Sequence, residues 1–444
     1  METSKYIPNQ LVRVGFFFAL MLSVFSPTAQ AKSIVLNLSS KSDTSSRSLA
    51  LQSYESLLIE GITAVSGDNS TIITSSSAAA SSQQNNSVHL YSNVIRTPEN
   101  EQEYYWITPV AAFPCDKATQ QCSSNVVENK DVSLSYIVLP KKTQYQDLAE
   151  QLALSASEFK VSQDFASLSS MIVDDLSSDD PNVVFSYGIL SFVGALPADT
   201  DNLWVISDLV PLFSEVGERG EVKGLAVDFV NSVLSDVGMS PTILFAPWQR
   251  IAKESITKSN VLVFSIAHTE EREHLFHWIT PISRNLHGLF GVNQSYYDNF
   301  DDVPRTLRIG GLKNDYRIGV AASHGFFTQS YDSWDALVSA VFDKQIDAIF
   351  ASQGAIDFAC DVNKQPCETI EQIAPYQISS AYLALSKRET SLVVVEKLKL
   401  ASARIKRSDE FRQTANKWSE MVNEHYHFAH YIENGVVHLW KKQQ

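Results

Sequence analysis

The sequence lacks an excess of basic residues. Its 444 residues include 35 Lys and Arg against 50 Asp and Glu, which gives a formal net charge of −15. Nucleic-acid binding depends on Lys and Arg contacts to phosphates, so this balance argues against a nucleic-acid partner. The length of the chain suggests two or three domains. Four cysteines are too few for a disulfide scaffold in a chain of this length. Aromatic residues at 10% exclude a disordered chain.

Long hydrophobic runs are also scarce. Residues 14–25 form an apolar run of 12, whereas a helix needs about 20 residues to cross a bilayer. Ser26-Pro27-Thr28 interrupts the run, and Ala29-Gln30-Ala31 has the small-x-small pattern of a signal peptidase site. We expect residues 1–31 to be a signal peptide cleaved after Ala31, and the mature chain to have no stable membrane insertion. The alternative is an uncleaved membrane anchor.

Motifs of common enzymes and metal sites are missing from the sequence. There is no G-x-S-x-G, no H-E-x-x-H and no phosphate-binding Gly-Lys-Ser/Thr loop. His425, His427 and His430 form the one histidine cluster, but no acidic or cysteine pattern completes a metal site around it. We therefore expect neither a metal nor a cofactor, and no enzymatic activity.

An internal repeat organises the chain. The segment WITPV at 106–110 matches WITPI at 278–282, and SYIVLPKKTQYQDLAEQL at 135–152 matches AYLALSKRETSLVVVEKL at 381–398. The spacing between these segments predicts a short module, 32–180, that lacks about 73 residues present in a long module, 203–425. A connector, 181–202, joins them. Glu433-Asn434-Gly435 predicts a hairpin in the tail, 426–444. The alternative is that the similarity is coincidental.

The cysteines repeat as well. Cys115 and Cys122 enclose six residues, as do Cys360 and Cys367. In a secreted chain this pattern predicts two short-loop disulfides, one in each module. The alternative is four free thiols.

Strand and helix patterns alternate through the long module. Apolar spacing predicts helices at 225–237, 334–342 and 390–404, and strands at 203–207, 261–266 and 382–386. We further expect a strand at 317–321, followed by a tight loop and a helix that starts near Ser323. This alternation predicts an α/β fold with largely parallel sheets.

The motifs of the long module resemble those of the family 3 bacterial extracellular solute-binding proteins. The resemblance rests on KGLAVDFVNSVLSDVG at 223–238, PWQR at 247–250, FSIAHTEEREHLFHWITPI at 264–282, IGVAASHG at 318–325 and IDAIFAS at 346–352. It implies a type 2 periplasmic binding protein fold, in which two lobes joined by a hinge close on a ligand, preceded here by a truncated single-lobe repeat.

The resemblance also implies the ligand-binding residues. In the first lobe they are Ser265, Thr269 and Arg272, with Trp248 and Arg250 as a pocket wall; in the second lobe they are Ser323 and Ser352. A guanidinium can grip a carboxylate with two parallel hydrogen bonds. Helix starts near Ser323 and Ser352 would add backbone amide donors.

Two departures bear on the ligand. Ser352 stands where amino-acid binders of the family carry an acidic residue for the ligand's ammonium group, and Ala267 replaces a second usual serine. Asp208 or Asp347 are possible substitutes for the acid. We expect a small carboxylate-bearing or amino-acid-like solute, delivered in the periplasm to the membrane permease of an ABC transporter. The alternatives are a ligand-binding subunit of a membrane receptor and, less favoured, a periplasmic enzyme.

The short module lacks these binding features. Asn100 occupies the position that matches Arg272, and most of a second lobe is absent. We therefore expect it to bind no ligand of the same kind.

Overall fold

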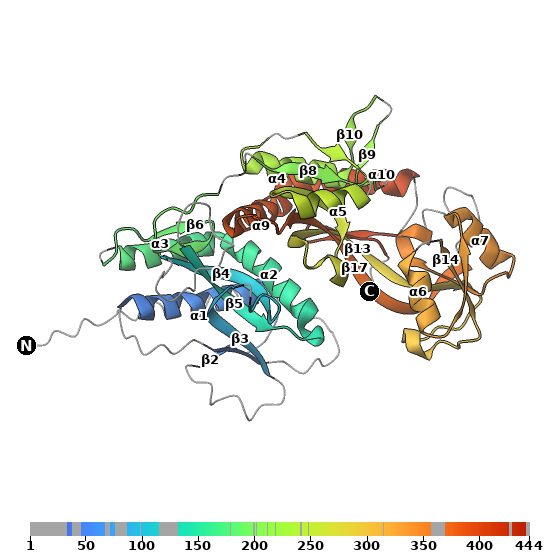
Figure 1. The fold of residues 1–444 in the computed structure, drawn as a ribbon, viewed down its shortest axis with the longest axis horizontal. Coiled ribbons are helices and arrows are strands. Elements are labelled where there is room, and N and C mark those ends of the chain that lie inside the picture. Colours follow the sequence, from blue (N-terminus) through green and yellow to red (C-terminus); the bar gives the residue numbers. More distant parts are fainter. Residues whose placement is uncertain are drawn as a thin grey trace, which may run out of the picture.

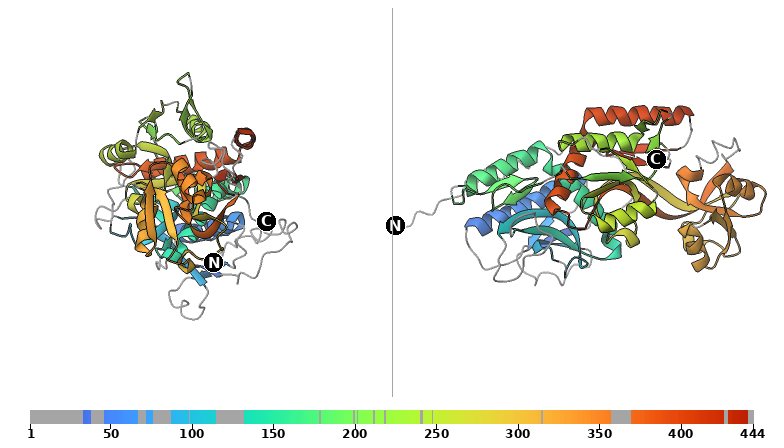
Figure 2. Two further views of the ribbon diagram at one scale, coloured as in Figure 1. Left: turned by 90° about the vertical axis from the view of Figure 1, so that its right-hand side faces the viewer. Right: turned by 45° about the horizontal axis from the view of Figure 1, so that its top comes forward.

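The computed structural model describes residues 33–37, 46–66, 72–75, 87–97, 99–114, 132–177, 179–198, 200, 202–210, 212–217, 219–239, 242–246, 248–313, 315–356, 369–425 and 429–440. The predicted signal peptide and all four cysteines lie outside these residues, so the cleavage site and both disulfides stay predictions. Within the described ranges, every helix is too short or too polar to span a bilayer. Figures 1 and 2 show the short module at one end of the molecule, a first lobe in the middle and a second lobe at the other end.

The short module is a seven-stranded sheet covered by three helices. Its strand order is β2-β1-β3-β5-β4-β7-β6. The strands are β1 (Ser33–Asn37), β2 (Ile72–Ser75), β3 (Ser87–Ile95), β4 (Tyr104–Pro114), β5 (Val132–Pro140), β6 (Val184–Ser186) and β7 (Ile189–Ser191). The helices are α1 (Ser46–Ser66), α2 (Gln146–Lys160) and α3 (Gln163–Leu176), with a 3₁₀ turn, η3 (Thr143–Tyr145), before α2. Leu58, Ile62, Leu90 and Ile137 are fully buried in the core between these helices and the sheet.

The first lobe of the long module contains three parallel strands and four helices. Its strands are β8 (Trp204–Ser207), β11 (Leu244–Phe245) and β12 (Val261–Ala267), and a small hairpin, β9 (Glu215–Val216) and β10 (Val222–Lys223), precedes the first helix. The helices are α4 (Leu225–Asp236), α5 (Trp248–Thr257), α9 (Leu392–Arg407) and α10 (Asp409–His425). Phe229 and Leu398 are buried in the core that α4, α9 and α10 share.

Two long antiparallel strands connect the second lobe to the first. β13 (Phe276–Val292) and β17 (Ile370–Ser386) pair along their whole length and pass from the first lobe into the second (Figure 1). The lobe adds β14 (Arg308–Leu312), β15 (Phe327–Tyr331), β16 (Ala348–Ser352), α6 (Tyr316–Ser323), α7 (Trp334–Phe342) and the 3₁₀ turn η5 (Phe300–Asp302). All of these strands belong to one ten-stranded sheet of order β11-β8-β12-β17-β13-β16-β14-β15, which β18 and β19 complete.

The predicted tail hairpin is present and belongs to the first lobe. β18 (Tyr431–Glu433) and β19 (Val436–His438) are joined by Asn434 and Gly435, both with positive φ, as a tight two-residue turn requires. β19 pairs in parallel with Ser283 and Arg284 of β13. In the predicted connector, β6 and β7 form a similar hairpin, and β7 pairs in parallel with β4. The connector and the tail therefore each contribute a short hairpin to a sheet.

The sheets of the short module and the first lobe share their strand pairings. In each, the first strand pairs in parallel with two others, and two antiparallel strands and a hairpin follow on one side. The register of β4 against β5 shifts after Trp106 and after Pro109. The register of β13 against β17 shifts at the matching positions, after Trp278 and after Pro281. The WITP segments thus have the same local geometry in both sheets.

A lysine lies under each hairpin, and it is buried at Lys160 and partly buried at Lys406. Lys160 Nζ donates to the carbonyl oxygen of Pro109 at 2.7 Å, and Lys406 Nζ donates to that of Pro281 at 2.5 Å. Burial lowers the pKa of Lys160 to about 8 and that of Lys406 to about 7. The hairpin turns pack on these lysines at Gly188 and Gly435, where a Cβ atom would lie 2.7 Å from lysine side-chain carbons.

Candidate ligand site at the hinge

The topology brings the carboxyl ends of the parallel strands in both lobes to the hinge. β12 ends at Ala267, which pairs with Ala381 of β17, and Ala381 in turn pairs with Ser283 of β13. In the second lobe, β16 ends at Ser352, which pairs with His287 of the same β13 strand. Positions 283 and 287 are about 13 Å apart at 3.3 Å per residue. Ligands of open α/β sheets bind at the carboxyl ends of strands, so this is where a ligand site is expected.

Ser265 lies at a bulge in β12. It has a φ of 56°, and the register against β17 shifts between Val263 and Ile266. A residue with left-handed backbone at a bulge redirects the strand that follows. Asn93 in β3 has the same φ and lies at the corresponding bulge of the short module. The Ser265 hydroxyl is buried without a hydrogen-bond partner among the described residues, which is a costly state for a polar group and is frequent at functional positions.

Arg272 lies in a short 3₁₀ turn, η4 (Glu270–Arg272), just beyond the end of β12. Its Nη1 donates to the carbonyl oxygen of Ala267 at 3.0 Å, which draws the guanidinium back over the strand end. Thr269 is exposed and is the residue before this turn. The structure therefore brings Ser265, Thr269 and Arg272 to one strand end, as their sequence spacing predicts.

A partly buried acid, Glu273, anchors the loop that carries Arg272. Glu273 Oε2 accepts hydrogen bonds from Trp278 Nε1 at 2.8 Å and pairs with His268 Nε2 at 2.6 Å. Burial by itself raises the pKa of Glu273, but the contacts with His268, Lys387 and Trp278 hold it below its ordinary value. The carboxylate is thus kept ionised, and it fixes the loop against the aromatic side chain of Trp278.

The predicted pocket wall from the PWQR segment is only partly described. Trp248 begins α5, but its side chain is not among those described. Arg250 is exposed, with its Nε 3.8 Å from Glu254 Oε1 on the next turn of the helix. Arg250 therefore has a carboxylate partner on its own helix.

In the second lobe, the prediction for residues 317–325 is wrong. The segment expected to be a strand is helix α6, and Ser323 is its last residue rather than the start of a helix. The helix begins where the Asp315 side chain accepts from the Arg317 amide and ends before Gly325, whose φ is 85°. Ser323 donates to the carbonyl oxygen of Val320 and is exposed, so it has no amide donors of a helix start around it.

Ser352 lies where the sequence places it. It is the buried last residue of β16, and its hydroxyl accepts from the amide of Ala355, so it caps the helical turn at 353–356. Asp347 lies at the other end of β16, where its carboxylate pairs with Arg308. Asp347 is therefore remote from the strand ends, whereas Asp208 follows β8 directly and is exposed at the same edge as Arg272.

A polar cluster at the hinge was missed by the sequence analysis. Arg317 is buried, forms a two-pronged ion pair with Asp315, and its Nη1 lies 3.2 Å from Nδ1 of His287. The other ring nitrogen of His287 lies 2.5 Å from Ser379 Oγ. Burial and the Arg317 charge lower the pKa of His287 to about 4, so the ring is neutral at pH 7. The sequence signal was Asp315 followed by an apolar helical spacing that stops at Gly325.

The start of α6 lies beside this cluster. Tyr316 is about half exposed, and its hydroxyl accepts from Gln377 of β17 at 3.3 Å. Burial raises the pKa of Tyr316 above its ordinary value, although the neighbouring Arg317 lowers it. The second lobe thus presents a capped helix start, an aromatic side chain and Ser352 at the edge that faces the hinge.

Part of the chain is similar in sequence to a known binding protein. The ABC transporter arginine-binding protein 1 of Escherichia coli (strain K12) is 22% identical over 229 residues, which cover 51% of this chain and 93% of that protein. The chain resembles the type 2 periplasmic binding proteins.

Solved structures align with about half of the chain at low sequence identity. A histidine kinase sensor domain with similarity to periplasmic binding proteins aligns with a TM-score of 0.40 at 12% identity, over 50% of this chain and 97% of that chain. Holo ArgBP from T. maritima aligns with a TM-score of 0.36 at 13% identity, over 48% of this chain and 95% of that chain. No family model matches the sequence.

Proposed function

We propose that the long module binds a small solute that carries a carboxylate, and that it closes its two lobes on that solute by bending β13 and β17. One observation supports this proposal most: the carboxyl ends of the parallel strands in both lobes meet at a hinge of two strands. A solute held there contacts both lobes at once, so its binding energy favours the closed arrangement.

The proposed contacts follow from the residues at the two edges. Arg272 supplies the guanidinium for the carboxylate, with Ser265 and Thr269 beside it. The hydroxyl of Ser352 approaches the solute from the second lobe, beside the start of α6, which Asp315 already caps. Asp208, which is exposed at the end of β8, is the acid available for an ammonium group, because Asp347 is paired with Arg308. An amino acid therefore fits the site, and so does a simple carboxylate.

We further propose that the chain is exported through its first 31 residues and delivers this solute to an ABC transporter. The predicted signal peptide supports the export, and the resemblance to an ABC transporter arginine-binding protein supports the delivery. Protein sequencing of the secreted chain is expected to begin at Lys32. Genes for a permease and an ATPase beside this gene are expected, whereas a receptor gene there would point to the sensory alternative.

The test of the solute site uses Arg272→Ala. The mature chain, 32–444, is screened by calorimetry against L-amino acids and small carboxylates, and each ligand found is then titrated into the variant. Loss of a two-pronged charged contact is expected to weaken binding by about 30-fold or more, since charged hydrogen bonds contribute about 1.5–3 kcal/mol. Arg412→Ala is the matched control, because Arg412 is exposed on α10 and pairs only locally with Asp409. Unchanged affinity in Arg272→Ala would refute the assignment.

A further inference from the structure

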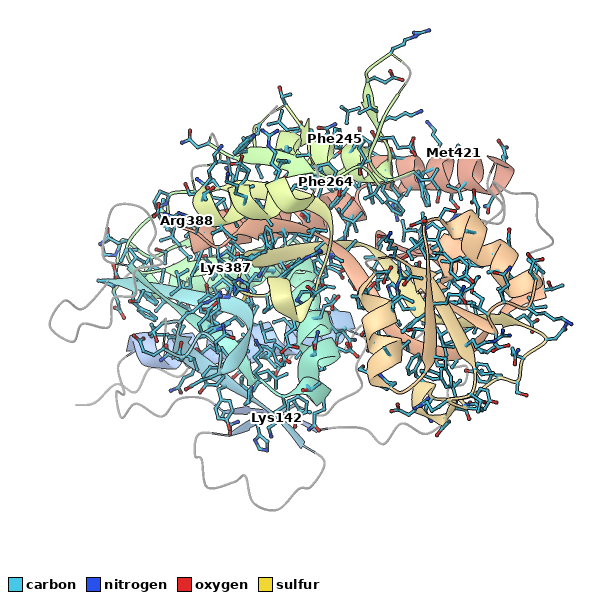
Figure 3. All side chains as sticks on the ribbon, turned by 45° about the vertical axis from the view of Figure 1, so that its right-hand side comes forward. Lys142, Phe245, Phe264, Lys387, Arg388 and Met421 are labelled. Atoms are coloured by element: carbon cyan, nitrogen blue, oxygen red, sulfur yellow. The ribbon has the colours of Figure 1, made fainter. Side chains whose placement is uncertain are left out.

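The short module and the long module meet through equivalent surfaces. α2 of the short module packs against α9 of the long module, and these two helices hold corresponding places in the repeat. Leu392 and Val393 at the start of α9 are buried in the same apolar cluster as Tyr136 and Val138 of β5. Lys387 reaches across to Glu101 at 3.2 Å, and Figure 3 labels Lys387 where the two modules meet.

Charged and titratable side chains near this interface influence each other in reciprocal pairs. Tyr136, Glu150 and Lys160 have the same spacing along the chain as Tyr382, Glu396 and Lys406. The Glu150 carboxylate faces Tyr382 and Lys406, and the Glu396 carboxylate faces Tyr136 and Lys160. Such reciprocity is the mark of an interface with two-fold symmetry, here formed within one chain.

One of the positions at which the symmetry is broken lies in the hinge. Arg284 of β13 corresponds to Ala112 of β4, because each follows its WITP proline by three residues. Arg284 Nη2 donates to Glu150 Oε1 at 2.8 Å, whereas Ala112 is fully buried and offers nothing to Glu396. Glu396 instead pairs with Lys399 of its own helix at 3.1 Å.

Arg284 lies where β13 leaves the first lobe. Its neighbour Ser283 still pairs with β19 of the first lobe, whereas His287 already pairs with β16 of the second. The backbone carbonyl of Arg284 accepts from the Leu439 amide, so the tail strand holds the main chain while Glu150 holds the side chain. Glu150 also faces Tyr382, which lies on the other hinge strand, β17.

We propose that the short module packs on the long module like a second subunit and restrains its hinge through Glu150. This inference rests on the proposed function of the long module as a hinged binding module. Glu150 acts as a positioning residue: by tying Arg284 of one hinge strand and Tyr382 of the other to a single carboxylate, it restrains the bending that opens and closes the lobes. The short module thereby acts on solute binding without touching the solute.

The experiment compares Glu150→Gln with Glu396→Gln in the full mature chain, without any added solute. Glu396 is the matched control, since it holds the equivalent place in the interface but contacts no hinge residue. The readouts are hydrogen–deuterium exchange of the peptides that cover 284–292 and 370–380, and the melting temperature. Breaking an ion pair worth about 1 kcal/mol is expected to speed exchange in these peptides about fivefold in Glu150→Gln.

Both outcomes of this comparison are decisive. Faster exchange of the hinge peptides in Glu150→Gln alone, at a similar melting temperature for both variants, supports the proposal that Glu150 restrains the hinge. Equal exchange in the two variants, or exchange that follows the melting temperature in both, overturns it. If Glu150→Gln fails to fold, the swapped pair E150R with R284E provides the test, because restored slow exchange requires the contact itself. No solute is used, so failure of the Arg272 test leaves this result unaffected.

Discussion

Glu55 is a buried acid whose ionisation should destabilise the short module. It lies on α1, and its Oε2 accepts from Ser92 Oγ at 2.9 Å, whereas Oε1 has no hydrogen-bond partner among the described residues. Burial raises its pKa from the ordinary value of 4.5 to about 7. Between these two values the native state holds a proton that the unfolded state has lost. Stability therefore falls as the pH rises from 4.5 to 7.

The size of this effect follows from the pKa. At 1.36 kcal/mol per pH unit, the change corresponds to about 3 kcal/mol at pH 8. Glu55→Gln removes the charge while keeping an acceptor for Ser92, so we expect it to stabilise the short module by about 1 to 3 kcal/mol at pH 8 and by much less at pH 4.5. For a module of this size, that is a rise in melting temperature of about 3 to 10 °C.

Differential scanning calorimetry of the mature chain between pH 4.5 and pH 8 measures the difference between variant and wild type. Glu60→Gln is the control, because Glu60 is exposed on the same helix. A difference for Glu55→Gln that is the same at both pH values would refute the reasoning, because a buried charge must act only where it is ionised.

Two further predictions concern the long module. Gly224→Ala is expected to lower the free energy of unfolding by about 2 kcal/mol or more in urea titrations. The reason is that Gly224 has a φ of 123° and a Cβ there would lie 2.5 Å from the Phe213 carbonyl carbon. Gly238→Ala is the control: open space surrounds Gly238, so this substitution should lower the free energy of unfolding by about 1 kcal/mol. The pKa of about 4 for His287 means that the unfolded state gains a proton first, so His287 should lower the stability of the long module by about 2 to 3 kcal/mol between pH 6.5 and pH 4. His287→Gln should remove most of that fall, and an unchanged pH profile would show that the ring is not held neutral.

Elements with a strong apolar pattern were predicted well. Helix α7 has the predicted bounds, and α4 and β12 differ from prediction by one residue at the end. The long strands were predicted poorly, and only residues 382–386 of β17 were predicted as a strand. Residues 371–381 cross the hinge half-exposed, so they lack the alternation of apolar and polar residues that marks a strand.

The site divides in the same way. The spacing of Ser265, Thr269 and Arg272 follows a single strand end, so local sequence is enough to group them. The cluster of Asp315, Arg317 and His287 joins a helix start to a hinge strand, and only the three-dimensional pairing brings those together. The pattern also misled at residues 317–323, because the apolar run IGVAA is compatible with either a strand or a helix.

The order in which the strands pair has a consequence for folding during synthesis. The first lobe needs β17, α9 and β19, which follow the whole second lobe in the chain, so its sheet closes over long sequence separations and slowly. In the short module, β4 and β5 are close in sequence, and all of its strands leave the ribosome before β8. We expect the short module to fold first and to offer α2 as a ready surface on which α9 docks, so that it acts as an intramolecular chaperone for the lobe beside it.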